Sequence, residues 1–311
     1  MLRLPHIPTA QDLIDKSCRG GSKEGMKARA MGPKKPERIL TGEIRRVQIA
    51  ARIIEGELNA IVEQFPMIDE MSAFHQSLLD LRVKRDRYKK SLATVRWCSE
   101  RISSLRDKTL RKLKTSKESG HSGEFLGRAS SFIKRIGPDL KYLIEAKDAL
   151  LSLPMLRDDP TLVVAGIPNA GKSTFVRTLT GSKVKVASYP FTTTEILVGY
   201  KKVRHSEYQI IDSPGILDRP MNERNMVELK AVLAIKHLAD VVLFLIDPQA
   251  GLGLQENLCL EIRDGLGVKV VAAVNDKGGE LPTGYPVFNA TKPEDCDRMF
   301  RECFGISTTA G

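Results

Sequence analysis

Apolar residues in the first half of the chain recur at every third or fourth position over long stretches, which is the period of an amphipathic helix. One such stripe runs from Ile39 to Ile61, and the Phe65-Pro66 pair predicts where that helix stops. The helices expected from this pattern cover about 37–65, 71–79, 81–113, 125–136 and 138–153. We therefore predict an all-α helical bundle domain over residues 37–156.

The chain before residue 37 has a different pattern. Thr9 precedes a short amphipathic run and can act as an N-cap, so a helix is expected from there to about residue 17. Residues 20–36 hold five Lys or Arg together with four glycines and two prolines, a composition that cannot build a core. We expect this segment, within a separate region 1–36, to stay flexible until a partner orders it.

In the second half, short apolar runs alternate with segments of helical character. Alternating strands and helices predict an α/β domain over 157–311 with a doubly wound, mostly parallel sheet. A ligand site in such a sheet lies at the carboxyl ends of the strands. The expected strands are 162–165, 196–203, 208–212, 241–247 and 268–274; the expected helices are 174–179, 222–238 and 252–266, and a loop is expected at 183–190.

A glycine-rich loop follows the first of these strands directly. It reads Gly166-Ile-Pro-Asn-Ala-Gly171-Lys172-Ser173, which is the spacing of a phosphate-binding loop (P-loop) between a buried strand and a helix. Backbone N–H groups and the helix N-terminus would surround phosphate oxygens, Lys172 would reach the β and γ phosphates, and Ser173 would place its hydroxyl on Mg²⁺. A chance glycine-rich turn is the alternative. The combination of strand, spacing and helix favours a nucleoside triphosphate site.

A second motif follows the third expected strand. Asp212 stands at the carboxyl end of that strand, and Ser-Pro-Gly215 comes next. An Asp in this place can hold a metal-bound water, and the glycine N–H can touch the γ-phosphate only in the triphosphate state. Thr193 lies upstream and is expected to close on Mg²⁺. Ser173, Thr193 and Asp212 are therefore the predicted metal site.

The net charge of +11 is unevenly distributed. Residues 1–150 carry +12, whereas residues 151–311 carry −1. A basic half joined to a nearly neutral half indicates a polyanionic partner such as RNA, with Lys and Arg contacting phosphates; solubility alone is the alternative. Trp97 is the only tryptophan, so base stacking is expected to contribute little.

Other classes of protein are disfavoured by features that the sequence lacks. It contains no run of 18 apolar residues, and residues 1–8 lack the apolar core of a signal peptide. Five cysteines without a Cys-x-x-Cys pair argue against a disulfide framework or a zinc site. We expect no membrane segment, and we expect reduced thiols.

Several motifs together resemble a known family. The P-loop with Pro168-Asn169, the run Tyr189-Pro-Phe-Thr-Thr193, and the stretch from Asp212 to Pro220 followed by Glu-Arg-Asn225 resemble Obg-related GTPases, and more narrowly the nucleolar GTP-binding protein (Nog) family. The first half of this sequence is a basic helical domain that contains the runs Glu63-Gln-Phe-Pro66 and Leu150-Leu-Ser-Leu-Pro154. In these features it is similar to that family's N-terminal region.

The resemblance implies a GTPase that binds GTP and GDP with Mg²⁺ and acts in assembly of the large ribosomal subunit. Its partner would be the precursor of that subunit and its ribosomal RNA (rRNA), which agrees with the uneven charge. The sequence ends about where the GTPase domain (G domain) should end, so it resembles a short, archaeal-type member. A cytoplasmic location and a monomer off the ribosome are expected.

The resemblance also implies roles for individual residues. Lys172, Thr193, Gly215 and Asn169 would act in hydrolysis, and Asn169 holds the P-loop position at which related GTPases bind K⁺. Ile216 stands where Ras-like proteins place a water-orienting Gln, so intrinsic hydrolysis is expected to be slow. The residues expected to bind nucleotide are Gly166, Pro168, Asn169, Ala170, Gly171, Lys172, Ser173, Thr174, Asp212, Gly215, Asn275, Asp276, Asn289 and Ala290.

Base recognition departs from the family pattern. The family uses Asn-Lys-x-Asp, whose Asp accepts both guanine N–H donors, but this sequence has Asn275-Asp276-Lys277-Gly278. Asn289-Ala290-Thr291 fits the loop whose N–H meets the guanine O6. Either Asp276 reaches the base through a rearranged loop, or guanine selectivity is weak. Two hypotheses therefore stand beside a GTPase switch: an RNA-binding scaffold whose nucleotide site barely turns over, and an ATPase.

Overall fold

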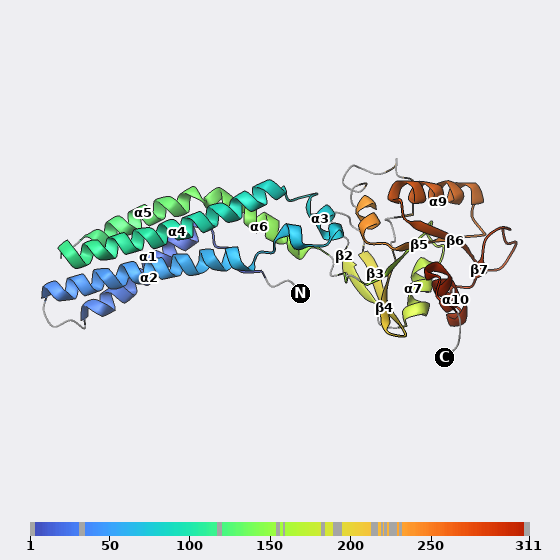
Figure 1. Cartoon of the computed structure of the whole chain (residues 1–311), viewed down its shortest axis with the longest axis horizontal. Helices are drawn as coiled ribbons and strands as arrows, with labels where there is room; N and C mark the ends of the chain where they lie inside the picture. Colours follow the sequence, from blue (N-terminus) through green and yellow to red (C-terminus); the bar gives the residue numbers. More distant parts are fainter. Residues whose placement is uncertain are drawn as a thin grey trace. The chain divides into compact units, whose positions relative to one another are not determined.

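The computed structural model describes most of the chain, and the described residues form two units. One unit is Met1–Glu70 with Arg82–Leu151, and the other is Met71–Leu81 with Ser152–Gly311 (Figure 1). In the described part of the chain, no helix is both long enough and apolar enough to cross a membrane. The described residues are 4–30, 35–116, 120–153, 156–157, 159–181, 184–188, 195–212, 217–218, 220, 223, 229 and 232–307.

The first unit is a helical bundle, as the apolar periodicity predicts. Its helices are α1, α2, α4, α5 and α6, of which α2 and α4 are the longest (Figure 1). Helix α1 packs on α2, α2 packs on α4, and both α5 and α6 pack on α4. The elements are α1 (Ala10–Ala30), α2 (Lys35–Gln64), the 3-10 turn η1 (Ile68–Glu70), α4 (Arg85–Ser116), α5 (His121–Arg135) and α6 (Gly137–Leu151).

The predicted apolar stripe forms the core of this bundle. On α2 the spacing by threes and fours brings one face towards α4, and the side chains on that face have no accessible surface. The periodicity therefore correctly identified the buried apolar face, although four polar residues of these helices are buried as well: Glu43, Ser91, Ser99 and Thr109. The fully buried stripe residues are Val47, Ala51, Ile54, Leu58 and Ile61 of α2 with Val95 and Ile102 of α4.

Helix α1 differs from the expectation for the N-terminal region. Thr9 caps it as predicted, since its hydroxyl accepts the Asp12 N–H at 3.1 Å, but the helix continues to Ala30. The predicted flexible segment is therefore wrong for residues 20–30, while 31–34 lie outside the described residues. Gly21 and Gly25 face α2, and a Cβ on either would lie 2.8 Å from a backbone oxygen of that helix. Because these glycines have no side chain, the two helices can approach each other closely. The composition of the segment does not reveal this contact, since the contact exists only when α2 packs beside α1.

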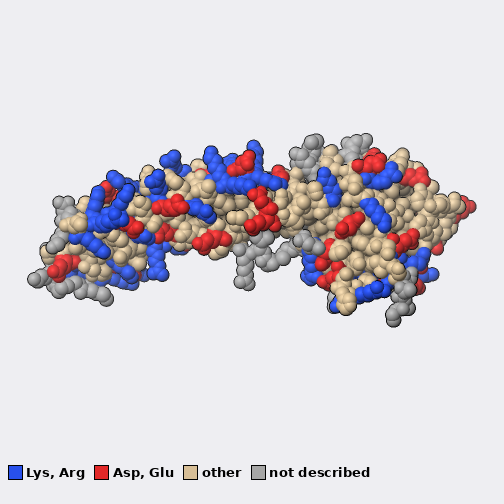
Figure 2. Space-filling view, viewed as in Figure 1, with Lys and Arg blue, Asp and Glu red and all other residues tan. Residues whose placement is uncertain are grey.

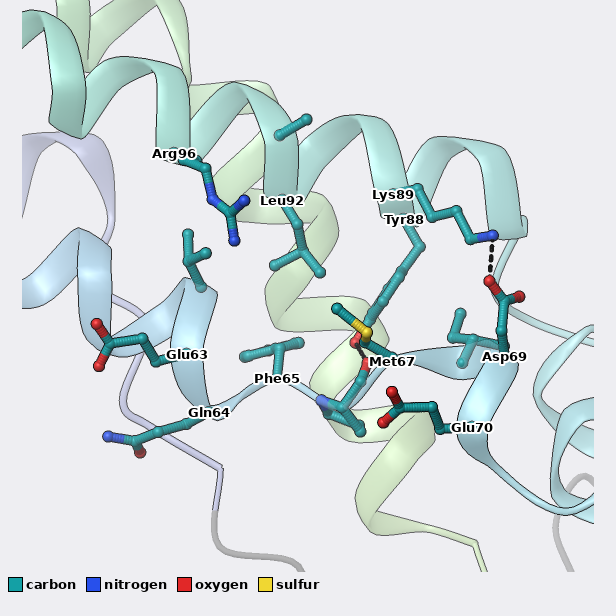
Figure 3. A pocket seen from close by; sticks show the side chains of 14 residues that line it. Glu63, Gln64, Phe65, Met67, Asp69, Glu70, Tyr88, Lys89, Leu92 and Arg96 are labelled. Carbon is teal, nitrogen blue, oxygen red and sulfur yellow. Dashed lines mark hydrogen bonds and ion pairs between the residues drawn. The ribbon is translucent and has the colours of Figure 1, made fainter.

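The run Glu63-Gln-Phe-Pro66 forms the turn that ends α2. Phe65 is buried against Tyr88 of α4, with ring centroids 6.1 Å apart, and the Tyr88 hydroxyl donates to the proline carbonyl at 2.8 Å. Lys89 pairs with Asp69 at 2.6 Å on the same turn (Figure 3). A cavity of about 850 Å³ opens beside it. This run therefore fixes how the end of α2 meets the start of α4.

The second unit contains a seven-stranded sheet in the order β2-β3-β4-β1-β5-β6-β7. Strands β2, β3 and β4 pair antiparallel, and the other neighbouring strands pair parallel. Every residue of β1 and β5 is buried, as expected for central strands covered on both faces. The strands are β1 (Thr161–Ala165), β2 (Lys185–Ser188), β3 (Glu195–Val203), β4 (Ser206–Asp212), β5 (Val241–Ile246), β6 (Lys269–Asn275) and β7 (Val287–Phe288).

Helices cover both faces of this sheet. Helices α7 (Lys172–Thr180) and α10 (Pro293–Phe304) lie on one face, and α9 (Leu252–Leu266) lies on the other (Figure 1). Side chains of α7 and α10 share one apolar core with β1 and β5. The arrangement is the predicted α/β fold with a doubly wound, mostly parallel sheet.

Several elements of this unit were not expected from the sequence. Strand β2 occupies part of the loop predicted at 183–190, because its partner β3 supplies the hydrogen bonds that define it. Helix α10 was not predicted, although Pro293 in its first turn and Gly305 at its C-cap are ordinary helix signals. The helix predicted at 222–238 is described only in part; its end includes a 3-10 turn, η3 (Ile235–His237).

The segment Met71–Leu81 interrupts the helical domain that was expected to be continuous over 37–156. Its helix α3 (Ala73–Leu79) contacts η3 and belongs to the second unit. Phe74, Leu78 and Leu79 form its buried apolar face. A helix of seven residues is stable only when its apolar face packs on a larger hydrophobic core. Its position in the sequence does not show which of the two units provides that core.

Candidate nucleotide-binding site

The P-loop joins β1 to α7, as the motif predicts. Gly166 has φ +136° and Gly171 has φ +98°, both in the range that side chains disfavour. A Cβ on Gly166 would lie 2.5 Å from the Leu245 carbonyl oxygen, and a Cβ on Gly171 would lie 2.3 Å from Nδ2 of Asn275. The loop therefore needs glycine at both positions, and its backbone comes close to the ends of β5 and β6.

Lys172, the first residue of α7, turns back over this loop. Its Nζ donates to the carbonyl oxygens of Gly166 and Ile167, both at 2.8 Å. The side chain is buried, and burial lowers the pKa of its ammonium below the ordinary lysine value. Two neutral carbonyls only partly compensate a buried positive charge, so an anion bound in the loop would be strongly favoured.

Ser173 and Asp212 meet on the opposite side of the loop. The Ser173 hydroxyl donates to Oδ2 of Asp212, which stands at the end of β4. Asp212 is fully buried, and burial raises the pKa of its carboxyl. Its Oδ1 has no hydrogen-bond partner among the described residues. A buried carboxylate oxygen without a donor is suited to a cation or to a metal-bound water.

These residues fit Mg²⁺, because hydroxyl and carboxylate oxygens are its usual protein ligands and substrate phosphates complete the set. Within the described part of the chain, no three His, Cys, Asp or Glu residues cluster closely enough to hold a metal ion by themselves. Thr193, the third predicted metal ligand, lies outside the described residues, as does Gly215.

The end of β6 forms the third side of the site. Asn275 donates from Nδ2 to the Ala170 carbonyl at 2.9 Å and accepts the Ala290 N–H at 3.0 Å. One side chain thus ties the P-loop to the loop that follows β7. Asn289 is fixed in the same loop, since its N–H donates to Asp295 at 3.1 Å.

Lys277 contributes a second link that the sequence analysis missed. Its Nζ donates to the Asn169 carbonyl of the P-loop and pairs with Asp247 at 2.7 Å. Asp247 follows β5 directly and is in turn held by Gln255 of α9, whose side chain accepts the Asp247 N–H at 2.8 Å. Asp247 could have been identified as a site residue from the sequence, because it stands at the carboxyl end of a buried strand, where ligands bind in this type of sheet.

Asp276 has its carboxylate engaged within its own loop. Oδ1 accepts the Gly278 N–H at 2.8 Å, and the Asp276 N–H donates to the Phe288 carbonyl at 2.7 Å. The remaining predicted nucleotide-binding residues Pro168 and Thr174 are exposed at the P-loop and on α7. The structure therefore brings together Asn169, Lys172, Ser173, Asp212 and Asn275 around one loop.

Comparison with known proteins agrees with this geometry. Residues 2–156 match the NOG1 N-terminal helical domain, and residues 161–276 match the 50S ribosome-binding GTPase domain. An uncharacterised protein of Methanocaldococcus jannaschii is 35% identical over 88% of this chain and 79% of its own length. Nucleolar GTP-binding protein 1 of Drosophila melanogaster is 31% identical over 82% of this chain. The chain belongs to the nucleolar GTP-binding protein 1 family.

The chain spans less than half the length of the named nucleolar GTP-binding proteins that it matches. The chain covers 40% of the Drosophila protein, so that relative contains much sequence with no counterpart here. Among solved structures, a Plasmodium falciparum protein described as nucleolar GTP-binding protein 1 is 26% identical over 50% of this chain and 89% of that chain, with a TM-score of 0.43.

Relative to the pattern expected of the nucleolar GTP-binding protein 1 family, the unusual part of the site is the run Asn275-Asp276-Lys277-Gly278. Asn275 contacts the P-loop, and so does Lys277, although Asp276 stands between them. Gly278 has φ +88° and no side chain to offer a base. The P-loop contacts of this region are therefore present, while the expected acceptor for guanine is absent from the position where the family pattern has it.

Proposed function

We propose that this protein binds GTP with Mg²⁺ at the P-loop and hydrolyses it as a switch in assembly of the large ribosomal subunit. The observation that supports the proposal best is the arrangement of Lys172, Ser173 and Asp212 around a loop that needs glycine at positions 166 and 171. The similarity to nucleolar GTP-binding proteins supports the choice of GTP as the nucleotide and of the ribosome as the partner.

In this proposal each residue acts on the phosphates in a defined way. Lys172 exchanges its two carbonyl acceptors for phosphate oxygens, and the first turn of α7 points its free N–H groups at them. Ser173 and Asp212 hold Mg²⁺, which would neutralise charge on the transferred phosphoryl group. Asn275 and Lys277 hold the P-loop in place through hydrogen bonds to its backbone carbonyls.

The direct test is equilibrium binding of GDP, GTP, ADP and ATP to the purified protein with Mg²⁺. Binding should be micromolar or tighter, and Lys172→Met should weaken it at least roughly tenfold through loss of a charge-assisted contact. Lys236→Met is the matched control, since Lys236 is exposed on η3 and should leave affinity unchanged. Equal losses in both variants, or no binding by the parent protein, would overturn the proposal.

Weak discrimination between guanine and adenine is a second candidate for this site. It is supported by the Asp276 carboxylate, which accepts the Gly278 N–H instead of lying free for a base. If Asp276 does read guanine, Asp276→Asn should reduce the ratio of ADP to GDP dissociation constants. An unchanged ratio would mean that this carboxylate does not select the base, and equal GDP and ADP affinities would favour a general nucleoside triphosphatase.

The role in ribosome assembly is tested by RNA binding and by turnover. Docking of the basic helical unit through about six phosphate contacts predicts that log affinity for rRNA falls with log salt at a slope of about −4 to −5. Addition of large ribosomal subunits should also raise GTP turnover above the slow intrinsic rate. A slope near zero contradicts docking through phosphates, and a rate insensitive to subunits favours the scaffold hypothesis.

The predicted K⁺ site at Asn169 can be tested by exchanging salts. Asn169 is exposed and has φ +65°, while its main-chain carbonyl accepts the Lys277 ammonium. If its side chain helps to hold K⁺ beside the phosphates, GTP hydrolysis should be faster in KCl than in NaCl at equal ionic strength. Equal rates in the two salts would remove K⁺ from the proposal.

A further inference from the structure

One exposed face of the helical unit carries positive side chains around the single tryptophan. Lys90, Thr94, Trp97 and Arg101 are spaced by four, three and four residues, so they share one side of α4. Arg135 joins them from α5. The guanidinium carbons of Arg101 and Arg135 lie 5.6 Å and 5.3 Å from the centroid of the Trp97 ring. We call Lys90, Trp97, Arg101 and Arg135 the Trp97 cluster.

The cations of this cluster are not neutralised by acidic residues. Within the described residues, Lys90, Arg101 and Arg135 form neither an ion pair nor a side-chain hydrogen bond. Two other cations of the same helices are paired: Arg106 with Glu55 at 2.6 Å and Arg128 with Glu124 at 3.1 Å. The positive charge of the Trp97 cluster is therefore available to a partner.

The ring of Trp97 holds these guanidinium groups in place. A cation stacked on an indole loses less side-chain freedom when it later binds an anion. Phe132 braces the indole edge-on, with ring centroids 5.9 Å apart at 77°. A cavity of about 300 Å³ beside the ring is lined by Lys90, Ala93, Thr94, Trp97 and Arg135. The cluster thus has ordered donors and space beside them.

We propose that the Trp97 cluster binds the phosphate backbone of RNA. Guanidinium groups match phosphate geometry in a bidentate manner. Lys90 and Arg135 line the cavity, and Arg101 lies over the same indole, so the three cations suit successive phosphates better than a single carboxylate. Lys and Arg side chains are also numerous over the visible face of the helical unit (Figure 2), consistent with the net charge of +12 in residues 1–150, most of which belong to this unit. This inference rests on the proposed docking to rRNA and names the part of the unit that does it.

The single tryptophan makes the proposal directly measurable. Because Trp97 is the only tryptophan in the 311 residues, intrinsic indole emission of the full chain reports on this cluster alone. Titration with large-subunit rRNA should quench or shift that emission over the same concentration range in which filter binding shows complex formation. Binding without a change in emission would place the RNA elsewhere and overturn the proposal.

Charge-matched variants separate the cluster from general electrostatics. Arg101→Gln with Arg135→Gln removes two charges from the cluster, and Arg45→Gln with Arg52→Gln removes two exposed charges from α2. The cluster variant should lose roughly tenfold or more in affinity and reduce the salt slope by about 2, whereas the α2 variant should lose much less. Equal losses in the two double variants would overturn the proposal.

Trp97→Leu tests whether the ring matters in addition to the charges. It keeps all three cations but removes the surface on which two of them stack, so affinity should fall while the salt slope stays unchanged. Affinity equal to the parent would show that the indole has no part in binding. If the unmodified chain does not bind rRNA even at low salt, docking to rRNA as part of the proposed function is refuted. That result differs from a loss of rRNA affinity seen only in the variants, which bears on the Trp97 cluster alone.

Discussion

The close approach of α1 to α2 provides a quantitative test of the structure. A Cβ added at Gly25 would lie 2.8 Å from the Gly42 carbonyl oxygen and 3.0 Å from Cβ of Arg46. The first of these atoms belongs to backbone inside a helix, so it cannot rotate away as a flexible side chain would. Gly25→Ala therefore requires the two helices to move apart or to shift against each other.

The expected cost combines two opposing effects. Overpacking at a tight contact costs about 1–3 kcal/mol, whereas replacing glycine by alanine within a helix contributes about 0.5–1 kcal/mol in favour of folding. The net expectation for Gly25→Ala is a loss of roughly 1 kcal/mol in the free energy of unfolding. Urea unfolding of the full chain, followed by Trp97 emission, measures this quantity for the helical unit in which that tryptophan lies.

Gly127 of α5 provides the matched control. It also lies inside a helix, but an added Cβ would meet no atom within 4 Å. Gly127→Ala should therefore stabilise the protein by about 0.5–1 kcal/mol. If Gly25→Ala stabilises the protein as much as Gly127→Ala, then α1 does not pack on α2, and a flexible glycine-rich segment would describe residues 20–30 better than a helix.

Further predictions concern the nucleotide site. Gly171→Ala would place a Cβ 2.3 Å from Nδ2 of Asn275 at φ +98°, and calorimetry should show nucleotide affinity reduced roughly tenfold or more. Lys277→Met leaves Asp247 without its ion pair, and the unfolding free energy should fall by about 1–3 kcal/mol in denaturant titrations of the nucleotide-free protein. Asp212→Asn should raise the melting temperature of the nucleotide-free protein at neutral pH and abolish Mg²⁺-dependent triphosphate binding. The sign follows from burial, which raises the pKa of Asp212: its favourable contribution to stability is complete below the ordinary aspartate pKa and is lost as pH rises through the higher folded value.

The sequence was sufficient to predict those parts of the fold whose signals are local. The helix at 252–266 was predicted with the bounds that α9 has, and the strand before Gly166 was predicted within one residue of β1. Both have continuous apolar periodicity and clear boundary residues, such as Gly267 at the end of α9. The same holds for the P-loop, because its glycines, lysine and serine act at fixed spacing along the chain.

The parts that were missed depend on residues far apart in sequence. In the sequence, the glycines at 21 and 25 suggest a break in the helix. In the structure they lie at the contact with α2, where a side chain would not fit. Strand β2 exists only through its pairing with β3. The Lys277–Asp247 pair joins residues 30 positions apart. The strand before Asp247 marks that residue as a site candidate, but nothing in the sequence shows that Lys277 is its partner. Composition and periodicity describe what one segment prefers, but these features arise from what two segments do together.

The use of positive charge in the two units supports the separation of their proposed roles. In the second unit, two cations near the sheet have acidic partners: Lys277 pairs with Asp247 at 2.7 Å and Lys201 with Asp297 at 2.6 Å. In these pairs the positive charge is matched by a carboxylate, and residues 151–311 as a whole are nearly neutral. In the Trp97 cluster, by contrast, the arginines are held by an indole, which orders them without cancelling their charge. An excess of lysine and arginine that merely kept the protein soluble would not need this arrangement, so the cluster favours a specific polyanionic partner over solubility as the reason for the basic half.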